Sequence, residues 1–148
     1  MFSKILVVCV GNICRSPAAE GLLRHLLSEK GGNISVSSAG ISALVGKSAH
    51  DKASELMKKT GVDLTSHKAR QLDAALVHDH DLILVMEEGH VKAVEALVPS
   101  ARGKVHLLGK WRQGVEIPDP YRKGDAAFEH AHELIESTVA DWVKKLCR

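Results

Sequence analysis

Aromatic residues are scarce in this chain: only five of its 148 residues are Phe, Trp or Tyr. Because 45% of the residues are nevertheless hydrophobic, we expect a core built mainly from aliphatic side chains. The length suits one domain with one core, so we expect residues 1–148 to form a single domain. No apolar run approaches the ~20 residues that a membrane span requires, so we expect no membrane insertion.

Cysteine is also rare, and no sign of charge dominates. Three cysteines do not form the dense disulfide framework of a small secreted protein, and Cys147 is expected to be a spare surface thiol. A net charge of +2, with both signs interspersed, is too weak for a nucleic-acid-binding surface, so we expect no nucleic-acid partner. The first residues carry no secretory signal pattern. We therefore expect a cytoplasmic monomer.

Short apolar runs alternate along the chain with segments of helical periodicity. Strands are expected at residues 5–8, 34–37, 82–86 and 105–108, and helices at residues 17–27, 51–59, 72–77, 87–98 and 125–146. This alternation predicts an α/β fold, an open four-stranded parallel sheet flanked by helices. Ligands of such sheets bind beyond the carboxyl ends of the strands.

The loop after the first expected strand is the most informative segment. It places the thiol of Cys9, the guanidinium of Arg15 and the hydroxyl of Ser16 close together, directly before a helix that starts with Pro17. The free N–H groups and the dipole at a helix amino terminus favour an anion, and such surroundings also favour the reactive thiolate form of a cysteine. We interpret the segment as a phosphate-binding loop with Cys9 as nucleophile. Ser16 is also expected to cap the helix.

The Cys-x5-Arg-Ser pattern resembles the phosphate loop of the low-molecular-weight protein tyrosine phosphatases. Four later segments are similar to other landmarks of that family, in the family's order: Ser37–Gly40, His67–Gln71, Asp81–Met86 and Ile117–Tyr121. Within the family the likeness is strongest to bacterial enzymes paired with tyrosine autokinases of capsule or exopolysaccharide export. The resemblance implies hydrolysis of protein phosphotyrosine through a phosphocysteine, with no metal and no organic cofactor, and a bacterial tyrosine autokinase as the phosphotyrosyl partner.

The resemblance assigns the chemistry to three residues. It implies that Cys9 is the nucleophile, that Arg15 binds the phosphoryl oxygens bidentately, and that Asp119 acts first as general acid and then as base. Pro118 and Pro120 flank Asp119, which favours a stiff, non-helical loop. The alternative interpretations are a structural cysteine, a surface ion pair and a turn aspartate.

Other residues are expected to shape the pocket. Backbone N–H groups from residue 10 to residue 15 form the anion cradle, in which Val10, Gly11 and Ile13 contribute shape rather than chemistry. The resemblance places Leu44 and Tyr121 at the entrance. Because family members that act on phosphoarginine carry a smaller, polar threonine at the position of Ile13, the isoleucine favours phosphotyrosine.

The resemblance also implies supporting residues. Ser16 donates a hydrogen bond to the Cys9 sulfur, while Asn12 holds the loop in shape together with Ser38 and His67. For His67, an exposed loop position is the alternative. Cys14 traps the oxidised nucleophile as a reversible disulfide, unless it is a passive buried cysteine.

Three other functions compete with this interpretation. An arsenate reductase needs a further downstream pair of redox cysteines, where this chain has only Cys147. A catalytically silent phosphate-binding module is expected to have lost Cys9 or Asp119. A nucleotide-binding domain needs a glycine-rich loop pattern that this loop lacks. Residues 78–80 and 130–132 each hold two histidines, which we expect at the surface rather than on a metal.

Overall fold

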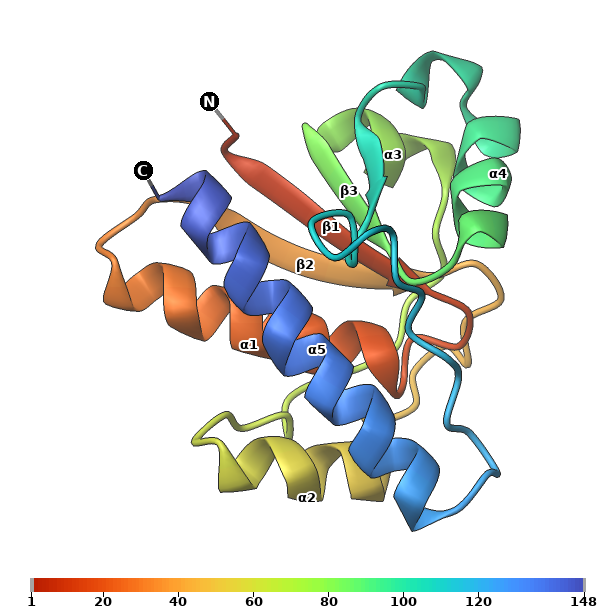
Figure 1. Cartoon of the computed structure of the whole chain (residues 1–148). Helices are drawn as coiled ribbons and strands as arrows, with labels where there is room; N and C mark the ends of the chain where they lie inside the picture. Colours follow the sequence, from red (N-terminus) through yellow and green to blue (C-terminus); the bar gives the residue numbers. More distant parts are fainter. Residues whose placement is uncertain (1, 148) are drawn as a thin grey trace.

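Four parallel strands form the centre of the molecule (Figure 1). The computed structural model describes residues 2–147. The strands are β1 (Lys4–Cys9), β2 (Ser35–Gly40), β3 (Leu82–Val85) and β4 (Val105–Leu107). They lie in the order β2-β1-β3-β4, and every neighbouring pair is parallel. The predicted open four-stranded parallel sheet is confirmed.

Five α-helices surround the sheet in the described part of the chain. They are α1 (Arg15–Glu29), α2 (Asp51–Lys59), α3 (Ala74–Asp79), α4 (Glu88–Leu97) and α5 (Asp125–Leu146), and a short 3₁₀ helix spans Pro99–Ala101. Helices α2 and α5 have the predicted bounds. Helix α1 extends two residues further than predicted at each end, and α3 lies two residues later than predicted.

Alternation of side chains along β1 divides the core into two. Ile5, Val7 and Cys9 pack with α1 and α5, while Leu6 and Val8 pack with α3 and α4 on the opposite face (Figure 1). Both faces of β1 are therefore buried, which explains why this strand is an uninterrupted apolar run in the sequence.

The strand order gathers distant segments at one edge of the sheet. Residues 10–14 connect β1 to α1 there, between the carboxyl ends of β2 and β3. Ile41 N, after β2, donates to Cys9 O (2.9 Å), and Ile117 N donates to Met86 O, after β3 (3.0 Å). The loop of residues 108–124, which follows β4, therefore returns to the phosphate loop.

The predicted helix cap at Ser16 is wrong. Helix α1 begins at Arg15, so Ser16 lies in its first turn and Cys14 occupies the capping position without a side-chain cap. The hydroxyl of Ser16 instead contacts Cys9 Sγ and the Asn12 side chain, and it is fully buried.

The surface assignment of the paired histidines is correct only in part. His78 and His130 are exposed, but His80 is buried between Ser37 Oγ (3.0 Å) and the backbone oxygen of Leu76 (2.7 Å). His132 is also largely covered, with its side chain 12% exposed beside a glutamate. Within residues 2–147 no group of three or more His, Cys, Asp or Glu side chains is placed to hold a metal ion. None of the described helices combines the length and apolar character needed to cross a membrane.

Candidate active site

A pocket of about 190 Å³ opens at the carboxyl end of β1. Three segments that are remote in sequence form its wall: the phosphate loop, the segment after β2 and the loop that carries Asp119. The lining residues are Cys9, Val10, Gly11, Ile13, Cys14, Arg15, Ser42, Leu44, Asp119 and Tyr121. The structure thus brings the expected nucleophile, guanidinium and acid into one pocket. Ser42 is a lining residue that the sequence did not reveal.

The hydroxyl of Ser16 lies within hydrogen-bond distance of the sulfur of Cys9. The Cys9 side chain is almost fully buried, and its Sγ lies 2.9 Å from Ser16 Oγ. Asn12 Nδ2 donates to the same hydroxyl oxygen (2.7 Å), and the hydroxyl keeps its own hydrogen to donate to a neighbouring acceptor. Ser16 is therefore placed to donate to the Cys9 sulfur whenever that sulfur acts as an acceptor.

Asn12 is the centre of the network beneath the loop. Its backbone is left-handed (φ 60°), a conformation that asparagine tolerates better than most residues. Its side chain donates to Ser38 Oγ (2.9 Å) and accepts from Arg70 N (2.9 Å), while its backbone oxygen accepts from His67 Nε2 (2.7 Å). His67 is therefore a half-buried member of the network and not a freely exposed loop side chain.

Arg15 is held from the side opposite the pocket. Its side chain is 2% exposed, and Nη1 donates both to Glu87 Oε2 (2.5 Å) and to Ile117 O (2.8 Å). A buried guanidinium is strongly unfavourable without such partners. Because Nη1 is engaged, Nη2 and Nε are left as donors for an anion in the pocket. Nη2 also lies 3.9 Å from Asp119 Oδ2.

Glu87, the ion-pair partner of Arg15, is a residue of the site that the sequence analysis does not identify. It directly follows the strand β3 and the buried Met86, at the sheet edge where ligands of parallel sheets bind. Its place directly after a buried strand is the feature of the sequence that could have identified Glu87 as a site residue. A second omitted residue, Glu20, accepts a hydrogen bond from Ser38 Oγ and so completes the network under Asn12.

Asp119 and Tyr121 form the outer wall of the pocket. Asp119 Oδ1 accepts from Tyr121 N (3.1 Å), which fixes one carboxyl oxygen, and the side chain of Asp119 is 44% exposed. The ring of Tyr121 meets the His50 ring edge-on, with a centroid distance of 6.0 Å, and His50 stacks on Phe128. Asp119 is thus positioned by its own turn, and Tyr121 by aromatic packing.

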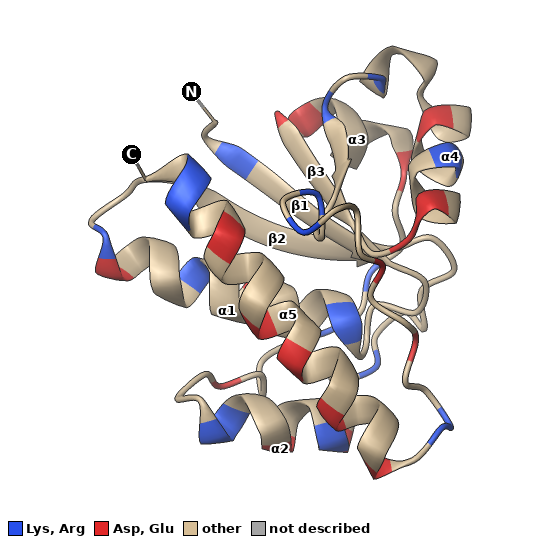
Figure 2. Ribbon diagram, viewed as in Figure 1, with Lys and Arg blue, Asp and Glu red and all other residues tan. Residues whose placement is uncertain are grey.

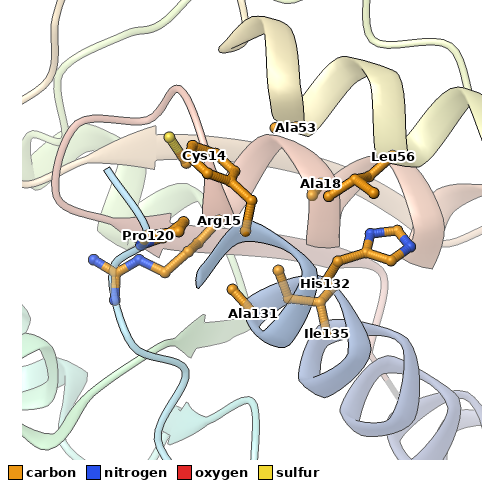
Figure 3. A pocket seen from close by; sticks show the side chains of 10 residues that line it. Cys14, Arg15, Ala18, Ala53, Leu56, Pro120, Ala131, His132 and Ile135 are labelled. Atoms are coloured by element: carbon orange, nitrogen blue, oxygen red, sulfur yellow. The ribbon is translucent and has the colours of Figure 1, made fainter. Parts of the chain in front are cut away.

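A smaller, mostly apolar cavity of about 20 Å³ lies behind the phosphate loop (Figure 3). The guanidinium of Arg15 points away from it, whereas Cys14 lies at its edge (Figure 3). Burial, together with the negative charges of Cys9 and Asp119, raises the pKa of the Cys14 thiol to about 12 against the opposing effect of Arg15. Cys14 is therefore a neutral thiol at physiological pH, unlike the thiolate that an attack on phosphorus requires.

Comparison with known proteins agrees with this arrangement. A family model described as low molecular weight phosphotyrosine protein phosphatase matches residues 4–148. The chain belongs to this family. It is a protein-tyrosine-phosphatase, as its curated relatives are.

The relatives are similar over nearly the whole chain. Low molecular weight protein-tyrosine-phosphatase Wzb of Salmonella typhimurium is 47% identical, covering 99% of this chain and 95% of its own. Among solved structures, Vibrio vulnificus Wzb in complex with benzylphosphonate is 48% identical with a TM-score of 0.93, covering 98% of this chain and 99% of its own. The YwlE arginine phosphatase, as a mutant with a phosphorylated active-site serine, is 28% identical with a TM-score of 0.90, covering 97% of this chain and 95% of its own.

Proposed function

We propose that this phosphatase hydrolyses protein phosphotyrosine through a phosphocysteine on Cys9. The observation that carries the proposal is the single pocket in which Cys9, Arg15 and Asp119 converge. We further propose that residues 1–148 form one catalytic domain, since the matching family model spans residues 4–148.

The chemistry needs two displacements at phosphorus. In the first, Cys9 Sγ bonds to phosphorus, the bond to the tyrosyl oxygen breaks, and protonated Asp119 gives its proton to that oxygen. In the second, water attacks phosphorus, the P–S bond breaks, and the Asp119 carboxylate takes the proton from water. Arg15 and the backbone N–H groups of residues 10–15 stabilise the equatorial oxygens in both steps, and Ser16 stabilises the departing thiolate.

The shape of the pocket favours phosphotyrosine among phosphate esters. Cys9 lies at the bottom with only 2% of its surface exposed, while Leu44 and Tyr121 stand at the rim. An aryl group bridges that depth, whereas a phosphoserine side chain is too short. The binding of benzylphosphonate by the Vibrio vulnificus relative supports an aryl-sized pocket here. The similarity to an arginine phosphatase makes phosphoarginine the competing substrate, against which the apolar side chain of Ile13 argues.

The test compares phosphate release from a phosphotyrosyl peptide by the wild type and by Cys9→Ser, with phosphoseryl and phosphoarginyl peptides in parallel. Release from phosphotyrosine that disappears in Cys9→Ser, together with a phosphoenzyme trapped by rapid quenching of the wild type, supports the proposal. Substantial turnover by Cys9→Ser would contradict the covalent mechanism. Selective release from phosphoarginine would contradict the substrate assignment.

The proposed physiological substrate is a bacterial tyrosine autokinase that controls capsule or exopolysaccharide export. Support comes from the resemblance to the enzymes paired with such kinases and from relatives named Wzb, Etp and AmsI. The check is a host strain that produces Cys9→Ser in place of the wild type. We expect the phosphotyrosine of the autokinase to accumulate and polymer output to change, and an unchanged phosphotyrosine pattern would contradict the assignment.

We also propose that Cys14 protects Cys9 from irreversible oxidation. Peroxide oxidises the Cys9 thiolate to a sulfenic acid; Cys14 then forms the S–S bond, and the sulfenic oxygen leaves as water. Both side chains line the same pocket. Because the pKa of Cys14 is raised to about 12, the disulfide should form faster as pH rises toward that value.

The test compares the wild type with Cys14→Ser after treatment with peroxide. We expect dithiothreitol to restore the phosphatase activity of the wild type but not that of Cys14→Ser. Equal recovery in both proteins would refute the protective role.

A further inference from the structure

The loop after β4 presents an exposed tryptophan on a side of the molecule that the catalytic pocket does not use. Trp111 is 40% exposed, whereas Trp142 of α5, on which it packs, is 3% exposed. The two indole rings meet at a centroid distance of 5.4 Å and an angle of 69°. Trp142 is fixed in turn, since its Nε1 donates to Leu108 O (2.9 Å). The exposed ring therefore rests on a rigid base.

Backbone pairing joins the chain segments before and after Trp111. Gly109 pairs with Val115 in an antiparallel bridge, and Arg112 N donates to Gly109 O (2.9 Å). A side chain at Gly109 is excluded, because a Cβ there would lie 2.0 Å from Val115 O. Gln113 adopts a left-handed backbone (φ 59°), which is unfavourable for a non-glycine residue. The conformation of the loop is thus preformed, and binding on it requires little ordering.

Cations surround the exposed ring. The ammonium nitrogens of Lys145 and Lys110 lie 4.5 Å and 5.1 Å from the centroid of Trp111. Arg112 Nε is paired with Asp141 Oδ2 (2.7 Å). Within residues 2–147, neither lysine lies within ion-pair distance of a carboxylate. Three cations against one carboxylate leave this surface net positive, and Figure 2 shows blue segments on the loop and near the carboxyl end of α5.

We call these five residues the Lys–Trp surface: Lys110, Trp111, Arg112, Asp141 and Lys145. None of them lines the catalytic pocket. The surface is nevertheless connected to that pocket along the chain, because Ile117, later in the same loop, accepts a hydrogen bond from Arg15 through its backbone oxygen. The same loop continues from Ile117 to Asp119 in the pocket wall, so one chain segment joins the Lys–Trp surface to the pocket.

We infer that the Lys–Trp surface docks an acidic segment of the phosphoprotein on which the enzyme acts, a step that rests on the proposed function. Carboxylates of that segment pair with Lys110 and Lys145, and an apolar side chain covers the uncovered part of the Trp111 indole. A rigid tryptophan within a charged rim has the composition of an interface hot spot. Lys110 Nζ also donates to His106 Nδ1 (3.4 Å), a neutral partner that leaves its charge uncompensated. A polypeptide suits this surface better than a nucleic acid or a lipid surface, because the surface offers one aromatic ring and two lysines without a carboxylate partner in residues 2–147, rather than an extended basic stripe.

The test uses one phosphotyrosyl peptide joined through Gly-Ser linkers of several lengths to either an acidic tail (Glu-Glu-Leu-Glu-Glu) or its glutamine counterpart. We expect the acidic tail to raise kcat/KM on the order of tenfold at low salt, a gain equivalent to about 1.4 kcal/mol that added salt removes. The double variant Lys110→Gln/Lys145→Gln should lose this gain and keep its rate on p-nitrophenyl phosphate. Lys92→Gln, an exposed lysine of α4, is the matched control and should keep the gain.

A binding measurement separates this inference from the proposed function. The unphosphorylated acidic tail should change the fluorescence of Trp111 in the wild type and not in the double lysine variant, whatever the phosphopeptide kinetics show. An equal kcat/KM for the two tails at every linker length, or a gain that survives in the double variant, would overturn the inference. So would tighter Trp111-dependent binding to phosphatidylglycerol vesicles or to oligo-dT than to the acidic tail. Intact p-nitrophenyl phosphate turnover without release from any phosphopeptide would instead count against the proposed function alone.

Discussion

Asp119 stands at the rim of the pocket with one carboxyl oxygen fixed by Tyr121 N and the other 3.9 Å from Arg15 Nη2. Asp119→Asn keeps the size and the turn but cannot transfer a proton. We expect turnover of a phosphotyrosyl peptide to fall on the order of 10²–10⁴-fold, because the tyrosyl oxygen needs that proton. Hydrolysis of p-nitrophenyl phosphate should fall far less, since p-nitrophenolate leaves readily as an anion. Steady-state rates of the wild type and of Asp119→Asn on the two substrates test this prediction. If both rates fell equally and only slightly, Asp119 would not be the general acid.

Glu87 orients the guanidinium of Arg15 without lining the pocket. In Glu87→Gln a side-chain oxygen that can accept the hydrogen bond from Arg15 remains, but the negative charge is lost. The guanidinium of Arg15 is therefore less firmly oriented toward the phosphate. The Glu87 side chain is 37% exposed, so solvent screens the pair, and the loss is smaller than for a fully buried ion pair. We expect the inhibition constant of inorganic phosphate to rise by roughly tenfold, or about 1.4 kcal/mol.

The control for Glu87→Gln is Glu88→Gln, a neighbouring substitution at an exposed side chain of the first turn of α4. It should leave phosphate inhibition unchanged. A wild-type inhibition constant in Glu87→Gln would show that Ile117 O alone suffices to hold Arg15.

At the scale of elements, the amino terminus of α4 depends on a neutral histidine. His90 Nδ1 accepts a hydrogen bond from Glu87 N (3.2 Å), which a protonated Nδ1 cannot do. Burial and the positive charge of Arg15 lower the pKa of His90 below its ordinary value of 6.5. As pH falls through 6.5, the unfolded chain binds the proton before the folded chain does, so the free energy of unfolding decreases.

His90→Gln tests this acid sensitivity, because a glutamine at the third helical position can accept the same hydrogen bond and does not titrate. We expect the free energy of unfolding, measured with urea, to fall less between pH 7.5 and pH 5 in the variant than in the wild type. Part of the decline should persist, since burial also lowers the pKa of His106. Parallel declines in both proteins would show that His90 does not contribute.

The elements that the sequence predicts well are those whose pattern is local. Strands β1 and β3 are buried on both faces and appear as apolar runs, and α5 has the predicted bounds because its periodicity extends over its whole length. The prediction of a helix cap at Ser16 is wrong because the contacts that decide it are not local. The hydroxyl of Ser16 satisfies the local rule for a cap, but it is used by Cys9 and Asn12, which only the folded loop places beside it.

At the scale of the whole molecule, the candidate site depends on contacts that no local pattern contains. Nothing near Arg15 in the sequence indicates that Glu87 and Ile117 hold it; strand order brings them together. The family resemblance supplied the pairing of Cys9 with Asp119, which spacing alone does not. The Lys–Trp surface joins a loop after β4 to the end of α5, so its composition emerges only from the fold.

Because Arg15 links α1 to Glu87 after β3 and to the loop after β4, an anion bound to it should stabilise the whole fold and not only the loop. A ligand that binds only the native state at 100 times its dissociation constant adds about 2.7 kcal/mol. For a domain of this size that corresponds to a rise in Tm of roughly 5–11 °C. Calorimetry of the wild type with increasing inorganic phosphate should show this rise, as should Arg102→Ala, which removes an exposed arginine beyond the pocket. Arg15→Ala should show little of it. An equal rise in Arg15→Ala would mean that phosphate stabilises the protein from a site other than the Cys9 loop.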